Sequence, residues 1–79
     1  MQLSGDEVTT LYRASNEVES YRDDDDFGLP IRRALASSDI VDRGSYSYVR
    51  YVLYRVAAQT GDTDFGDACL VLSERIRTS

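Results

Sequence analysis

The stretch SYSYVRYVLYRVAAQ, residues 45–59, lies in the longest segment of this 79-residue chain without a glycine, a proline or an acidic residue. When its residues are placed at about 100° each around a helix axis, the aliphatic side chains gather on one side. These side chains are Val49, Val52, Leu53 and Val56, with Ala57 at the edge. The pattern predicts a helix whose aliphatic side packs into the core of the domain.

The opposite side of the same helix carries tyrosine and arginine. Five residues form it: Tyr48, Arg50, Tyr51, Tyr54 and Arg55. Tyrosine and arginine are enriched among the residues that contribute most to binding at protein interfaces. We therefore predict that these five residues bind a partner. The alternative is a central helix packed on both sides, in which case the tyrosines belong to the core.

The beginning of the chain predicts a helix over residues 1–22. Ser4 and Glu7 have the spacing of a capping box, and Leu3 and Val8 that of a hydrophobic staple. The expected inward side chains are Val8, Leu11, Tyr12, Ala14, Val18 and Tyr21, and the expected outward ones are Thr9, Arg13, Asn16, Glu17 and Ser20. The like charges of residues 23–26 oppose the negative helix end, so the helix should stop there.

Two further helices are expected. One starts at Pro30, with Ile31, Ala34 and Leu35 inward, and ends near Ser38 or continues to Asp42 with Val41 inward. Gly44 follows as a break that can take a positive φ, and Gly61 is the expected C-cap of the helix at residues 45–59.

The last helix is expected to start at Thr63 or Asp64 as N-cap. The side chains spaced for burial are Phe65, Cys69, Leu72 and Ile76, widened by Ala68 and Leu70. Together these patterns predict an all-α fold, a compact bundle of about four short helices in a single domain spanning residues 1–79.

The charge pattern is unusual because all nine basic residues are arginine, while fourteen residues are acidic and the net charge is −5. An arginine-only chain suggests a GC-rich bacterium or its phage, and the excess of aspartate also fits a salt-adapted archaeon. A net negative charge disfavours general nucleic-acid binding, which relies on basic residues. In size and charge alone, without a shared motif, the chain resembles small acidic phage proteins that disable host defences by imitating a phosphate array.

The residues that usually carry catalysis or bind metals are scarce. The chain has no histidine and one cysteine, Cys69, so a zinc site or an internal disulfide is not expected. Residues 23–26 and 62–67 carry clustered aspartates but do not fit the EF-hand loop, whose glycine and final acid are misplaced or missing. We therefore predict no catalytic residue, no cofactor and no metal site.

No segment resembles a signal peptide, and the longest apolar run, residues 68–72, is far too short to span a bilayer. The expectation is a cytoplasmic protein without a membrane partner, located in the host-cell cytoplasm if phage-encoded.

These observations predict a small acidic non-catalytic protein-interaction module, such as a phage-type inhibitor or adaptor. It would bind a host or self protein, or form a homo-oligomer, through the Tyr/Arg side of residues 45–59. The alternative is a nucleic-acid-binding regulator of the helix-turn-helix type using the same helix. The long connection before Ser45 and the flanking acidic residues speak against this second hypothesis.

Overall fold

The computed structural model describes residues 1–21 and 39–79 of the chain. Its elements are the helices α1 (Gly5–Tyr21), α3 (Tyr46–Gln59) and α4 (Thr63–Arg77), with a short 3-10 turn, η1 (Arg43–Ser45), before α3. The all-α prediction is confirmed. The described ranges contain three α-helices rather than the about four that were predicted. The helix expected to start at Pro30 lies in residues 22–38, outside the described part.

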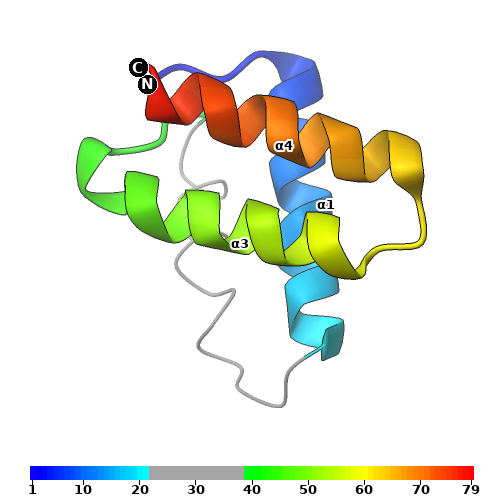
Figure 1. Ribbon diagram of the computed structural model, residues 1–79. Helices are drawn as coiled ribbons and strands as arrows, with labels where there is room; N and C mark the ends of the chain where they lie inside the picture. Colours follow the sequence, from blue (N-terminus) through cyan, green and yellow to red (C-terminus); the bar gives the residue numbers. More distant parts are fainter. Residues whose placement is uncertain (22–38) are drawn as a thin grey trace.

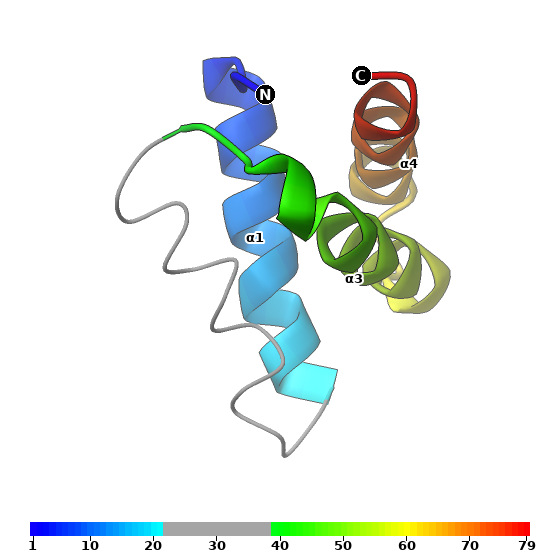
Figure 2. The ribbon, with the colours of Figure 1, turned by 90° about the vertical axis from the view of Figure 1, so that its left-hand side faces the viewer.

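The helices α3 and α4 run antiparallel beside each other, and α1 crosses both at a steep angle (Figure 1). Viewed along α3 and α4, these two helices lie on one side of α1 (Figure 2). The core fills the space between α1 and this helix pair. Among the described helices, α3 and α4 make the most extensive contact with each other.

The capping box at the start of α1 is confirmed. The Ser4 backbone N–H donates to Oε1 of Glu7 at 2.8 Å, and the Glu7 N–H donates to Oγ of Ser4 at 3.2 Å. Leu3 is buried and Val8 is half-buried against the core, as a hydrophobic staple requires.

Residues 39–41 pair with the start of the chain instead of forming a helix. The Leu3 N–H donates to the Asp39 carbonyl and the Val41 N–H to the Met1 carbonyl, both at 2.9 Å. Gln2 and Ile40 therefore form an isolated antiparallel bridge. Val41 is buried as predicted, but the proposed continuation of a helix to Asp42 is wrong, because this backbone is extended and uses its N–H groups across the pair.

Three predictions about helix ends are also wrong. No glycine in the described ranges has a positive φ, so neither Gly44 nor Gly61 takes the left-handed conformation. The C-cap of α3 is Thr60, whose extended backbone turns the chain away while its N–H still donates to the Val56 carbonyl. The N-cap of α4 is Asp62, whose Oδ1 accepts from the Phe65 N–H at 3.1 Å. The Asp62 carboxylate thus accepts from a free backbone N–H at the start of the helix, the role that had been predicted for Thr63 or Asp64.

The core confirms the inward side predicted for residues 45–59. The buried apolar residues are Leu3, Leu11, Ala14, Val18, Val41, Val49, Val52, Leu53, Val56, Phe65, Cys69, Leu72 and Ile76. Two predicted core residues, Tyr12 and Leu70, are instead 54% and 42% exposed. Ser15 and Ser73 are buried beside this core, and the Ser15 hydroxyl donates to the Tyr12 carbonyl at 2.7 Å. No helix in the described ranges is long and apolar enough to cross a bilayer.

Candidate functional site

The five residues predicted to bind a partner divide into two groups. Tyr51 and Tyr54 are 47% and 44% exposed. Tyr48, Arg50 and Arg55 are half-buried, and Tyr48 packs against the core. The outer side of α3 is therefore narrower than the sequence indicated, and the two exposed tyrosines dominate it.

Arginines on the same helix flank each of the exposed tyrosines. Nη1 of Arg55 donates to the Tyr51 hydroxyl at 3.4 Å, across one turn. The Arg50 guanidinium lies 5.8 Å from the centroid of the Tyr54 ring, at the outer limit of a cation–π contact. Arg50, followed by the Ser73 hydroxyl, lowers the pKa of Tyr54 by favouring the phenolate. Each of the two exposed tyrosines therefore has an arginine neighbour on α3.

The exposed surface continues from Tyr54 onto α4. A Cβ placed on Gly66 would lie 3.6 Å from the Ala57 carbonyl oxygen, so α3 and α4 approach closely there. Leu70 follows Gly66 by four residues and precedes Ser73 by three, which places it on the flank of α4 that faces α3. We call Tyr51, Tyr54 and Leu70 together the tyrosine face. Val71, which is 70% exposed, lies further out on α4.

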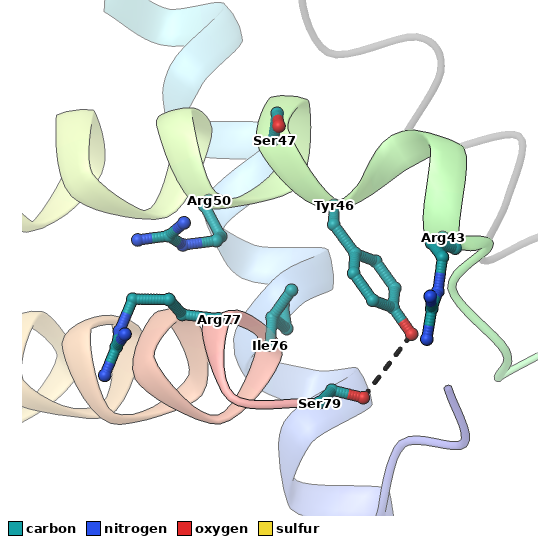
Figure 3. Close-up of a pocket in the computed structure, with 7 residues that line it drawn as sticks. All are labelled: Arg43, Tyr46, Ser47, Arg50, Ile76, Arg77 and Ser79. Atoms are coloured by element: carbon teal, nitrogen blue, oxygen red, sulfur yellow. Dashed lines mark hydrogen bonds between the residues drawn. The ribbon is translucent and has the colours of Figure 1, made fainter.

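A second feature lies where α4 ends beside the start of α3. A pocket of about 210 Å³ is lined by Arg43, Tyr46, Ser47, Arg50, Ile76, Arg77 and Ser79. We call it the arginine pocket. Figure 3 shows Arg43 beside the Tyr46 ring at one end, Arg50 and Arg77 at the other end, and Ile76 between them.

Two hydroxyl groups meet at the Tyr46 end of the arginine pocket. The Tyr46 hydroxyl lies 3.5 Å from Oγ of Ser79 (Figure 3). Ser79, together with the positive charges nearby that include Arg43, lowers the pKa of Tyr46. This end of the pocket therefore favours negative charge.

The sequence analysis identified only Arg50 of the residues in this pocket. A signal for part of it was present, because Tyr46 and Arg50 are one helical turn apart. Arg77 is the last residue of α4 and Ser79 follows the helix, so the antiparallel packing of α3 and α4 brings them beside the start of α3.

Residues 1–21 and 39–79 contain no cluster of three His, Cys, Asp or Glu residues that could hold a metal ion. Cys69 is buried, and desolvation raises the pKa of its thiol to about 11, so it is mostly protonated at neutral pH. The first helix of the hypothetical helix-turn-helix falls in residues 22–38, outside the described part.

Searches among protein-family models, curated proteins and solved structures found no match to this chain.

Proposed function

We propose that this chain is a small non-catalytic module that binds a protein, either a second copy of itself or another protein, through the tyrosine face. The observation that carries the proposal is the exposure of Tyr51 and Tyr54, nearly half of each residue, on the side of α3 opposite the core. Tyrosine offers a large, stiff contact area with a polar tip, which suits a surface that alternates between water and a partner.

Two properties of the surroundings support a protein partner. Leu70 extends the aromatic surface across to α4, so that a partner could bury apolar area from two helices at once. Arginines on α3 contact both tyrosines, and such contacts would reduce the side-chain entropy lost when the rings become fixed in a complex.

The proposal is tested by sedimentation equilibrium and by light scattering after size exclusion, over a range of protein concentrations. Tyr51→Ala and Tyr54→Ala should each weaken association by about 2 kcal/mol or more, while the melting temperature changes little. Tyr12→Ala is the matched control, because Tyr12 is equally exposed but lies on α1, outside the tyrosine face.

The same three variants apply to any other protein found to bind. Association that is equally weakened by Tyr12→Ala would mean that a different surface is involved. Unfolding by Tyr51→Ala would show that the tyrosine belongs to the core. Binding to an oligonucleotide would favour the nucleic-acid alternative if Arg55→Ala reduces its salt dependence. The slope of the logarithm of the binding constant against the logarithm of the salt concentration should then fall by about one.

A further inference from the structure

We propose that the arginine pocket binds a small oxyanion, namely a phosphate or carboxylate group of a small molecule. This site shares Arg50 with the surroundings of Tyr54, but its ligand does not depend on the function proposed above. Positively charged side chains line the pocket, although the whole chain is negative. Three of the seven residues that line the pocket are arginines, in a protein with a net charge of −5.

Among the described residues, three arginines and no acidic side chain line the pocket. Glu74 accepts hydrogen bonds from Nε and Nη2 of Arg77, so these two charges offset each other. Within residues 1–21 and 39–79, the ion pairs involve other arginines, and no carboxylate pairs with Arg43 or Arg50. Arg43 thus has no carboxylate partner within these ranges, Arg50 contacts the Tyr54 side chain rather than a carboxylate, and Nη1 of Arg77 takes no part in the hydrogen bonds to Glu74.

The pocket offers the donors that an oxyanion needs. Guanidinium groups match the geometry of phosphate and carboxylate oxygens, and the hydroxyls of Tyr46 and Ser79 can donate as well. Backbone groups contribute less, because the Ser45 and Tyr46 N–H groups already donate to the carbonyls of Asp42 and Arg43. Side chains would therefore form the site.

Size and charge indicate a small ligand rather than a nucleic acid. The volume of about 210 Å³ is below the roughly 300–1,000 Å³ of pockets that hold drug-sized molecules. A long polyanion would extend beyond the pocket over a surface with excess acidic residues, which repels it. A small anion interacts mainly with charges within the screening length of about 8 Å.

The binding test uses inorganic phosphate, pyrophosphate and malonate, titrated into ¹⁵N-labelled protein at pH 7 with sodium chloride adjusted to keep the ionic strength constant. The expected result is a saturable shift of the amide resonances of Tyr46, Ser47, Arg50, Arg77 and Ser79. Response to the two phosphates alone assigns a phosphate site, and response to malonate as well assigns a general oxyanion site. Absence of any saturable shift overturns the proposal.

Variants decide whether the pocket is responsible. Arg43→Gln and Arg50→Gln should each lower affinity about tenfold or more, because each removes charge-assisted hydrogen bonds. Tyr46→Phe keeps the ring and should lower affinity roughly two- to tenfold. Arg13→Gln is the charge-matched control, since Arg13 lies on α1 and pairs with Glu17 and Asp62. If Arg13→Gln weakens anion binding equally, the effect comes from the overall charge of the protein, and the proposed site is wrong. Melting curves verify that each variant is folded, and Arg43, which is exposed, is the variant least coupled to folding.

Discussion

The Arg13 guanidinium of α1 lies over the ring of Phe65 in α4, 3.8 Å from the ring centroid. Its Nη1 also donates to Oδ2 of Asp62 at 3.2 Å, and its Nη2 donates to Oε1 of Glu17 at 3.3 Å. Arg13 thus joins α1 to the first turn of α4 through an aromatic ring and the N-cap carboxylate. Arg13 had been predicted only to face water.

Replacing Arg13 by alanine should lower the midpoint of urea denaturation modestly. The change removes one partly exposed cation–π contact and two exposed ion pairs, each of modest value. Arg13→Lys keeps the charge but loses the planar stacking and the fork of donors, so its stability should lie between those of the parent and Arg13→Ala. Urea denaturation measures the stability of all three proteins. Equal midpoints for the parent and Arg13→Ala would show that these contacts do not stabilise the fold.

Replacing Ser4 by alanine should destabilise the protein by about 1 kcal/mol, because one half of the capping box is lost. Ser4→Asp retains an acceptor at the N-cap and should restore most of the loss. The pair is compared by thermal unfolding. If Ser4→Asp is as unstable as Ser4→Ala, the hydrogen bond to the Glu7 N–H is not the source of the effect.

The capping box could be predicted because it depends on residues three apart in the chain. The inward side of α3 was predictable for the same reason, since helical periodicity alone defines it. The predicted burial of Tyr12 and Leu70 was wrong because periodicity gives the direction of a buried stripe but not its width. On α1, burial of the small residues Ala14 and Ser15 completes the stripe beside Leu11.

Features that join distant parts of the chain could not be predicted in this way. The bridge between Gln2 and Ile40 joins two short segments whose sequences show no alternating strand pattern. The arginine pocket needs the antiparallel packing that brings Ser79 to Tyr46. The N-cap of α4 was predicted at Thr63 or Asp64, and the use of Asp62 instead also reflects Arg13, which comes from another helix.

Replacing Gly66 by alanine should leave the protein as stable as the parent or stabilise it by up to about 1 kcal/mol. Glycine is less favourable than alanine within a helix, and a new Cβ would meet Cγ2 of Thr60 at 3.4 Å and the Ala57 carbonyl oxygen at 3.6 Å, which are ordinary contacts. Gly66→Leu should instead destabilise the protein, because a large side chain would push α3 and α4 apart. Denaturant unfolding tests both changes. A clear loss of stability in Gly66→Ala would mean that the two helices approach more closely than described.

The buried Cys69 thiol should make stability fall at alkaline pH. Desolvation, followed by the negative charge of Glu17, raises the pKa of the thiol in the folded protein from 9.0 to about 11. Between these values the unfolded chain has lost the thiol proton while the folded chain retains it, so the unfolded state binds fewer protons and gains stability as the pH rises. The contribution of Cys69 is therefore fully present below about pH 9 and is lost progressively up to about pH 11.

The alkaline effect of Cys69 is isolated by comparison with Cys69→Ala, which has no thiol to ionise. The stability of the parent relative to this variant should decrease from pH 9 to pH 11, by an amount on the order of 2 kcal/mol. Comparison with the variant is needed because Tyr46 and Tyr54, whose pKa values are lowered in the folded protein, act in the opposite direction at high pH in both proteins. A stability difference that does not change with pH would mean that the Cys69 thiol ionises as readily in the folded protein as in the unfolded chain, in which case water reaches the space between α1 and α4.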